Sequence, residues 1–319
     1  MNHGTLKPML TTHFSRPKRL SRPQTPPPFR LTDRDVALLQ AVARWRFATS
    51  DQLVRYMRIS DPDASEQNVT RRLMALFAHR YLDRPSNQHV QLQAFSHLVY
   101  GIGRKGANLL AELGEDIDPR LKWATKNRRA SNAWLLHALG VTEAMILFEA
   151  ACAMRGDVAV RDGGSLVGDL PEHTRKLRDP MRLRVSITDK GKKIPLSVVP
   201  DRLLSLTLTN ERRFNFALEL DTGSMSVTGR FARKITAYVA AFREERHREQ
   251  WGFQGFRVAT VTPSEKRIMN MLAAQNAITS GRLAGMFIYT TPQRLNAHGP
   301  LGPIWITSER DDVSLLEGA

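Results

Sequence analysis

The chain has almost no cysteine, because Cys152 is the only one in 319 residues. A single thiol can form neither an intramolecular disulfide nor a thiolate metal cluster, so both are excluded as supports of the fold. Cys152 lies within an apolar helical stretch and is expected in the core. This cysteine usage is typical of proteins from a reducing, intracellular compartment.

Long apolar runs are also missing. No uninterrupted apolar segment reaches the roughly 18 to 20 residues that cross a bilayer, and the N-terminus lacks the apolar stretch of a signal peptide. Six prolines within residues 1–30 oppose the amphipathic helix of a transit peptide. We therefore expect a cytoplasmic protein with no membrane partner.

Several motifs that carry chemistry are absent. The sequence contains no GxxxxGK[ST] phosphate loop, no GxSxG nucleophile elbow and no histidine triplet of the kind found in tyrosine relaxases. Its nine histidines are scattered along the chain. No residue set for an organic cofactor is predicted.

Acidic residues are scarce relative to basic ones. Lys and Arg number 47 against 31 Asp and Glu, which gives a formal charge of +16 and indicates a polyanionic partner such as nucleic acid. Residues 1–30 hold six of these basic residues, six prolines and no acid, so we expect a disordered basic arm there. The other ten excess charges lie in the part of the chain expected to fold.

The length and the composition predict two folded domains. The two domains are predicted at residues 31–114, a winged-helix domain, and at residues 131–310, an α/β domain. A basic arm at 1–30 precedes them, a linker at 115–130 joins them and a tail at 311–319 follows.

The first domain is predicted from three short helices. Their starts are expected at Thr32 or Asp33, at Thr49-Ser50 and at Ser65-Glu66, since these residues are favoured helix caps. Two alternating runs, His89 to Phe95 and His97 to Ile102, look like the strands of a wing. The third helix has one apolar and one polar face, which fits a recognition helix in a DNA groove. The predicted DNA contacts are Gln67, Asn68, Thr70, Arg71, Arg72, Arg104 and Lys105. A merely solvated face, or a winged helix that binds protein, is the alternative.

The second domain is predicted to alternate helices and strands. In chain order we expect a helix from Asn132 to Met154, a strand from Val158 to Arg161, an irregular segment, strands Leu196–Leu208 and Phe214–Leu220, a helix from Gly229 to Glu245, a strand Phe256–Val261, a helix Ser264–Ala277, a strand Met286–Tyr289 and a short strand near Ile304. Trp134, Trp251 and Trp305 are expected to be core and domain-packing residues rather than to stack on bases.

Three carboxylates stand at the ends of the two central strands. Glu219 and Asp221 are two residues apart and so point to one face of a strand, while Phe216, Leu218 and Leu220 point to the other. A hairpin would bring Asp201 beside them, and such oxygen ligands suit Mg²⁺, with Mn²⁺ as a substitute. The predicted metal ligands are Asp201, Glu219, Asp221 and Glu143, with Glu149 as an alternative to Glu143. His137 could reach the same site. Acids at strand ends are also often only solvated.

The order of elements resembles the PD-(D/E)XK nuclease core. The matching residues are Pro200-Asp201 and Glu219-Leu220-Asp221, but Asp221 stands where the family pattern has lysine. Some members carry that lysine on the next helix, where this chain has Lys234. The resemblance implies an α/β (α+β) fold, with a mixed sheet flanked by helices. It also implies Mg²⁺-dependent nicking of DNA by the catalytic residues Asp201, Glu219 and Lys234.

The full pattern resembles the replication-relaxation family over roughly residues 31–310. The supporting stretches are Leu31-Thr-Asp-Arg-Asp, Arg71-Arg-Leu, Tyr100-Gly-Ile-Gly-Arg-Lys-Gly-Ala, His137-Ala-Leu-Gly-Val, Val199-Pro-Asp, Leu218-Glu-Leu-Asp and Arg233-Lys-Ile-Thr-Ala-Tyr.

This resemblance implies an accessory factor for replication, relaxation or mobilisation of plasmid or mobile-element DNA. Its expected partners are double-stranded DNA, other plasmid replication or mobilisation proteins, and a second copy of the chain. The alternatives are a non-enzymatic DNA-binding regulator on a degenerate nuclease fold and a protein-interaction module.

Overall fold

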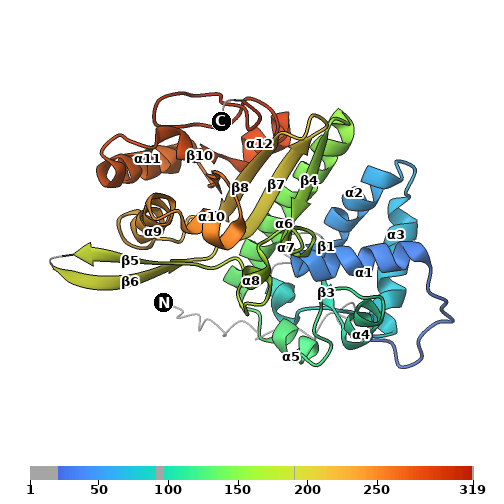
Figure 1. The fold of residues 1–319 in the computed structure, drawn as a ribbon. Coiled ribbons are helices and arrows are strands. Elements are labelled where there is room, and N and C mark those ends of the chain that lie inside the picture. Colours follow the sequence, from blue (N-terminus) through green and yellow to red (C-terminus); the bar gives the residue numbers. More distant parts are fainter. Residues whose placement is uncertain (1–20, 91–96, 190, 318–319) are drawn as a thin grey trace, which may run out of the picture.

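The computed structural model describes residues 21–90, 97–189 and 191–317. An N-terminal unit of four helices and a three-stranded sheet packs on the long helix α6, and α6 packs in turn on a five-stranded mixed sheet (Figure 1). Further helices cover the opposite face of that sheet. The expected α+β class, with a mixed sheet flanked by helices, is confirmed.

The helices of the N-terminal unit begin at capping residues. The Asp35 side chain accepts a hydrogen bond from the backbone amide of Thr32 at 2.9 Å, and Thr49 and Ser65 each accept one from the amide three residues ahead. The three predicted helix starts are therefore confirmed. The helices are α1 (Asp33–Trp45), α2 (Ser50–Ser60), α3 (Glu66–Ala78) and α4 (Arg104–Glu112).

A small antiparallel sheet completes this unit, with β3 (Val99–Ile102) between β1 (Phe47–Thr49) and β2 (Leu82–Asp83). β3 lies within the second predicted wing strand. The first predicted wing strand is not found at its start, because Ser86–Val90 form a short 3-10 helix, and residues 91–95 lie outside the described part of the chain. β1 was not predicted, since three residues between two helices carry no readable period.

Residues 21–30 are placed against the N-terminal unit, which corrects the prediction of disorder for this part of the arm. The ring of Phe29 stacks on that of His79 with centroids 4.9 Å apart, and His79 Nε2 lies 2.7 Å from the carbonyl oxygen of Pro27. Ring stacking of this kind holds a proline-rich segment that composition alone would leave unstructured. Residues 1–20 lie outside the described part.

The predicted linker carries a short helix, α5 (Trp123–Arg128). Its Asn127 is fully buried and donates a hydrogen bond to the carbonyl oxygen of Ile102 at 3.0 Å. This segment is therefore packed against the small sheet rather than extended between two bodies.

Helix α6 (Asn132–Arg155) is the central element of the fold. Its most apolar 18-residue window has a mean hydropathy of 1.5, enough by length and composition to cross a membrane, but 56% of that window is buried within the protein. It contacts α2 and β1 on one side and the large sheet on the other. Burial from both sides explains why it is apolar over most of its circumference.

The large sheet has the order β10-β9-β8-β7-β4. The pairs β4/β7 and β7/β8 are antiparallel, and β8/β9 and β9/β10 are parallel. Its strands are β4 (Val158–Asp162), β7 (Arg202–Leu208), β8 (Arg213–Leu220), β9 (Arg257–Val261) and β10 (Phe287–Thr290). Phe216 and Leu218 pack on the α6 side, whereas Ala217 packs on the side of α9 (Ala232–Arg243) and α11 (Glu265–Thr279). The predicted alternation along β8 is confirmed.

The predicted strand from Leu196 to Leu208 is wrong as a single strand. It is divided at Val199–Asp201, where Pro200 has no amide to donate to a ladder, so that β6 (Lys192–Val198) ends before β7 begins. β6 pairs with β5 (Leu183–Asp189), which lies in the segment expected to be irregular, and the two form a hairpin that projects from the body (Figure 1).

The remaining elements connect or cover these layers. They are α7 (Gly163–Val167), α8 (Glu172–Arg175), the π-helical turn η3 (Val227–Phe231), α10 (Arg246–Trp251), the 3-10 turn η4 (Ala284–Met286) and α12 (Pro292–His298). The short strand expected near Ile304 is reduced to two isolated bridges, Tyr289 with Ile306 and Trp305 with Val313.

Two of the three tryptophans expected in the interior are there. Trp251 and Trp305 are 1% and 0% exposed, whereas Trp134 is 42% exposed at the beginning of α6. Trp134 is therefore not a core residue, but its ring packs against Phe47 of β1, as a domain-packing residue would.

Gly140 of α6 lies directly against the Leu220 side chain of β8. A Cβ atom at this position would lie 2.4 Å from Leu220 Cδ2, so Gly140→Ala should force the Leu220 side chain to repack. We expect it to lower the free energy of unfolding by about 1–3 kcal/mol, measured by urea titration. Gly168→Ala is the matched control, because no atom lies within 4 Å of its added methyl group. Equal stability of the two variants would contradict this account of the packing.

Candidate functional site

The antiparallel pairing of β7 with β8 brings the predicted acidic residues together. Arg202 pairs with Leu218, so Asp201, one residue before β7, comes opposite Glu219. The Asp201 carboxylate accepts a hydrogen bond at 2.8 Å from the backbone amide of Leu220. The structure thus places Asp201 beside Glu219, as the predicted hairpin required, although the hairpin is shorter than expected.

Glu219 is buried, with 5% exposure, and points toward α9. Lys234 Nζ donates to one of its carboxylate oxygens and Tyr238 Oη donates to the other, at 2.6 Å for the tyrosine. Lys234 and Tyr238 are four residues apart on α9, so they lie on one face of that helix. A cavity of about 10 Å³ remains beside this group, which is room for a single water molecule.

Burial raises the pKa of Glu219 to about 8, and the charge of Asp201 acts in the same direction. The contacts from Lys234 and Tyr238 oppose this shift without cancelling it. Burial disfavours the charged form of Lys234 too, but the charges of Glu219 and Asp201 outweigh it and raise the lysine pKa. Lys234 and Glu219 are therefore a coupled pair within the protein interior.

Asp201 has a partner on the opposite side of the sheet. His137 Nε2, from α6, lies 3.1 Å from its carboxylate oxygen. Burial raises the pKa of Asp201, but the contacts with His137, Lys234 and the amide of Leu220 overcome this and lower it. The hydrogen bond to Asp201 in turn raises the pKa of His137. The two residues form an ion pair that links α6 to β7.

Asp221 belongs to a different group of contacts. Arg267, near the start of α11, donates to both of its carboxylate oxygens, and Thr262 Oγ1 donates to one of them at 2.7 Å. Arg267 also donates to the carbonyl oxygen of Met225 at 2.6 Å. Sequence reasoning missed Arg267. The one signal for it was a cation in the first turn of a helix, where the helix dipole disfavours positive charge.

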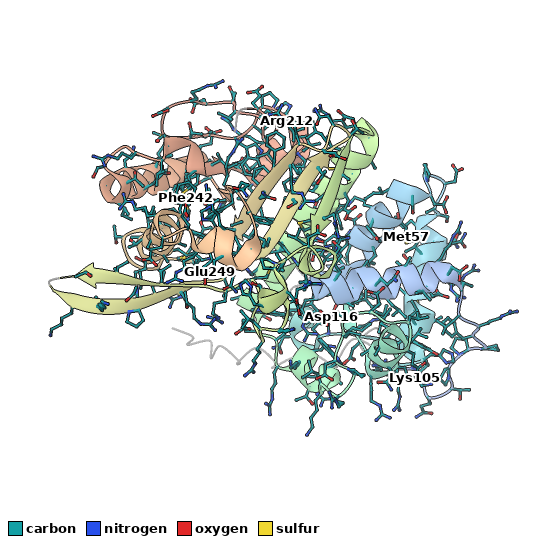
Figure 2. All side chains as sticks on the ribbon, viewed as in Figure 1. Met57, Lys105, Asp116, Arg212, Phe242 and Glu249 are labelled. Carbon is teal, nitrogen blue, oxygen red and sulfur yellow. The ribbon has the colours of Figure 1, made fainter. Side chains whose placement is uncertain are left out.

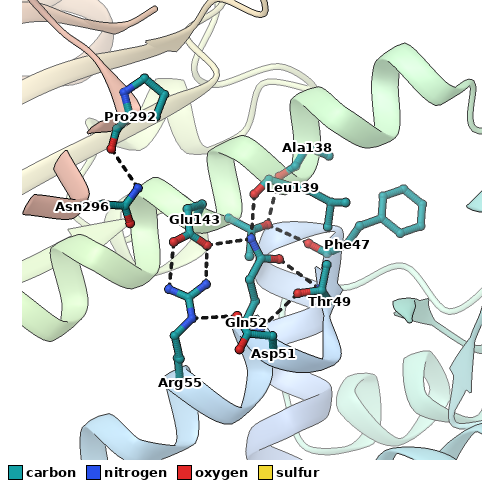
Figure 3. Close-up of polar contacts among 11 residues, drawn as sticks. Phe47, Thr49, Asp51, Gln52, Arg55, Ala138, Leu139, Glu143, Pro292 and Asn296 are labelled. Atoms are coloured by element: carbon teal, nitrogen blue, oxygen red, sulfur yellow. Dashed lines mark hydrogen bonds and ion pairs between the residues drawn. The ribbon is translucent and has the colours of Figure 1, made fainter. Parts of the chain in front are cut away.

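Glu143 and Glu149 point toward the N-terminal unit. Arg55 of α2 donates to both oxygens of Glu143, and Gln52 Nε2 lies 3.0 Å from one of them (Figure 3). Glu149 pairs with Arg44 of α1, with 2.8 Å between Nη1 and Oε1. Both glutamates therefore hold α6 against the N-terminal unit. The prediction that one of them joins Asp201 and Glu219 is not met in this arrangement.

The predicted four-carboxylate metal site is consequently not assembled in this arrangement. Within residues 21–90, 97–189 and 191–317, no group of three or more His, Cys, Asp or Glu side chains lies close enough to hold a metal ion. The oxygens of Glu219 and Asp201 have Lys234, Tyr238, His137 and a backbone amide as partners. As placed, these residues do not fit Mg²⁺, which would have to replace Lys234 at Glu219.

The residues predicted to contact DNA separate into two groups. Gln67, Asn68 and Arg71 are exposed on α3, Thr70 is half-buried, and Arg104 and Lys105 are exposed at the start of α4. Figure 2 shows Lys105 on the part of the N-terminal unit that is turned away from the large sheet. Arg72 differs from the others.

The Arg72 guanidinium pairs with Asp35, whose side chain is fully buried, and donates to the carbonyl oxygen of Arg30 at 2.8 Å. Breaking a buried pair leaves an uncompensated charge, so this contact stabilises the start of α1 and the arm. The Arg72 side chain is therefore engaged in contacts within the protein.

A basic groove runs beside α3 and α4. It has a volume of about 420 Å³, and its walls combine six basic side chains with one acidic side chain. These residues are Arg22, Arg80, Arg84, Arg104, Lys105 and Arg128, with Asp83 as the acid. Asp83 is paired with Arg22 at 2.9 Å. The groove therefore keeps a strong positive charge.

A larger cavity of about 1470 Å³ lies between the arm and α3, and Gln67, Thr70 and Arg71 line it. The arm is held at its edge by Arg22, whose guanidinium lies 4.3 Å from the centroid of the Phe77 ring. The exposed face of α3 and the arm thus border one concave surface.

Replacing Glu219 should reduce the dependence of stability on pH. Its pKa is raised in the folded state, so the folded protein keeps a proton that the unfolded chain releases, and stability falls as pH rises from about 4.5 to about 8. At about 1.4 kcal/mol per pKa unit, Glu219→Gln should remove a decline on the order of a few kcal/mol. Urea unfolding at pH 5 to 8 measures it. Glu309→Gln, at an exposed position, should behave like the wild type. The same slope in all three proteins would show that Glu219 is charged throughout.

Comparison with known protein families gives a match that covers the candidate site. The model of the family described as "Replication-relaxation" matches residues 39–255, which extend from α1 to beyond α9 and include Asp201, Glu219 and Lys234. A comparison with curated proteins gives no match. The chain therefore belongs to the replication-relaxation family.

Proposed function

We propose that this protein is a DNA-binding accessory factor in the replication, relaxation or mobilisation of plasmid or mobile-element DNA. Membership of the family indicates a role in plasmid or mobile-element replication or relaxation. The proposal adds that the protein acts in the cytoplasm by binding double-stranded DNA through its N-terminal unit as a winged helix. We further propose two kinds of protein partner: other replication or mobilisation proteins, and a second copy of this chain.

The basic groove beside α3 and α4 is the observation that carries this proposal. Its cations come from the arm, from the residues on either side of β2, from α4 and from α5, and they line one concave surface. Such an arrangement matches the phosphates of a duplex, which supply most of the salt-dependent affinity. The exposed polar side chains of α3, Gln67, Asn68 and Arg71, extend the same side of the unit and could reach base edges in a groove.

The double substitution Arg104→Ala and Lys105→Ala should weaken binding of a 30-base-pair duplex and flatten its salt dependence. Two lost phosphate contacts reduce the slope of log K against log[salt] by about 2. Fluorescence anisotropy between 50 and 200 mM NaCl measures both quantities.

The matched control is Arg243→Ala with Lys266→Ala, two exposed cations on α9 and α11, which should bind as the wild type does. Weak wild-type binding with little salt dependence would instead favour the protein-interaction module.

Magnesium-dependent cleavage is the second candidate function. The convergence of Asp201, Glu219 and Lys234 favours it, since these are the positions that the nuclease resemblance singles out. Glu219 is paired with Lys234, and the residues as placed do not fit Mg²⁺. Both observations favour instead a nuclease-like frame that binds DNA without cutting it. We propose the non-cleaving function as the better supported of the two.

Supercoiled plasmid incubated with the protein and Mg²⁺, Mn²⁺ or EDTA separates these functions. We expect a mobility shift without nicking, and the same shift with Glu219→Ala, because Glu219 is buried away from the groove. Nicking that requires the metal and is lost in Glu219→Ala, but persists in Glu309→Ala, would overturn the non-cleaving function and establish an active site.

A further inference from the structure

Arg46 is a cation for which the described part of the chain supplies no counter-ion. Its Nη1 atom is buried and has no hydrogen-bond partner, and within the described residues no carboxylate forms an ion pair with it. Burial lowers its pKa to about 10, so the guanidinium is still charged at neutral pH. A buried guanidinium nitrogen without a partner is unfavourable, and an anion beside it would supply the missing contact.

Aromatic rings fix the position of this guanidinium. Its carbon atom lies 4.7 Å from the ring centroid of Trp123, 4.9 Å from that of Phe47 and 5.8 Å from that of Trp134. The backbone of Arg46 has φ of 75°, a left-handed conformation that is unfavourable for a side chain other than glycine. The protein thus tolerates backbone strain at the residue that places the charge.

A cavity of about 490 Å³ opens at Arg46, and its lining is basic. Lys126, Arg129, Ala130, Ser131 and Trp134 complete its wall. Ser131 caps the start of α6, where the helix dipole adds further positive potential. The 42% exposed indole of Trp134 is held edge to face against Phe47, with centroids 5.2 Å apart. The cavity therefore offers three cations for a phosphate and one aromatic surface for a planar group.

We propose that this cavity binds one nucleotide unit of single-stranded DNA, with its phosphate at Arg46, Lys126 and Arg129 and its base stacked on Trp134. Stacking needs an unpaired base, because bases within a duplex already stack on one another. The proposal rests on the proposed function, and it narrows the substrate to DNA that is partly single-stranded.

Helix α5 joins this cavity to the basic groove. Ala124 and Arg128 line the groove, whereas Lys126 and Arg129 line the cavity. Two sites that share one short helix can contact adjoining parts of one DNA molecule. A DNA molecule with a duplex in the groove and a single strand in the cavity would contain a junction between the two, of the kind that melting or nicking produces.

Titration of the full chain with a dT12 oligonucleotide, followed by tryptophan fluorescence and anisotropy, tests the proposal. Trp45, Trp251 and Trp305 are buried, so quenching by the oligonucleotide reports on Trp134 and its neighbour Trp123. Trp134→Ala should weaken dT12 binding roughly tenfold, and Trp134→Phe should restore most of it. Neither substitution should change the affinity of the groove for a 30-base-pair duplex.

Arg46→Met separates binding from folding. It should weaken dT12 and an abasic 12-mer by the same factor, while the Tm stays equal to that of the wild type or rises, since an uncompensated buried charge has been removed. A lower Tm with unchanged dT12 affinity would show a structural role and overturn the proposal. Lys126→Glu with Arg129→Glu, both at exposed positions, tests the same phosphate contact without disturbing the interior.

The outcomes distinguish this inference from the proposed function. Duplex binding with dT12 affinity that is unchanged in all these variants overturns the inference alone. Binding of dT12 that depends on Trp134, without duplex binding, supports the inference and overturns the duplex proposal. Absence of both kinds of binding overturns both. Equal affinity for dTMP and dT12 would identify a free nucleotide as the ligand and overturn the assignment to a single strand.

Discussion

The Arg44 guanidinium lies between Asp162 and Glu149 and so joins the N-terminal unit to β4 and α6. Asp162 is fully buried, and the largely buried Arg202 donates to the backbone oxygen of Arg44 beside it. A carboxylate removed from water requires a charged partner of this kind, and Arg44 supplies it from the N-terminal unit. Loss of either side would leave a buried charge, so the two parts of the protein depend on each other for their packing.

The same constraint explains the acidic residues of the large sheet. Glu219 is matched by Lys234, Asp221 by Arg267 and Asp201 by His137. Each partner comes from a different helix, α9, α11 or α6, so these pairs hold the helical layers on both faces of the sheet. The arrangement has the residue types of a nuclease centre, but its carboxylates are used within the protein. This is why we propose a non-cleaving role in preference to cleavage.

Arg46 departs from this pattern, since it is surrounded by rings in place of a carboxylate. Its position at the end of α1, next to α5 and the start of α6, puts an unmatched positive charge where the N-terminal unit meets the rest of the chain. The groove that α4 and α5 border is also basic. Two basic concave surfaces, the groove and the cavity at Arg46, therefore adjoin α5.

The sequence by itself determined the local elements and the strongly basic charge of the chain. Capping residues such as Thr49 and Ser65 fixed the helix starts, the alternation of Phe216, Leu218 and Glu219 fixed the two faces of β8, and the +16 charge indicated a polyanion. These features could be predicted because they depend on neighbours within a few residues, or on composition alone.

Only the tertiary structure decided which charges meet. Arg72 looked like a DNA contact until Asp35 was found beside it, and Glu143 looked like a metal ligand until Arg55 was. Nothing in the spacing along the chain indicates such pairs, because their members are 37 and 88 residues apart. Trp134 and Arg46 were missed for the same reason, since exposure and the lack of a counter-ion are properties of the packed protein and not of a segment. The energy of a charge depends on its surroundings in space, which is why the sequence could supply the candidate residues while their roles required the fold.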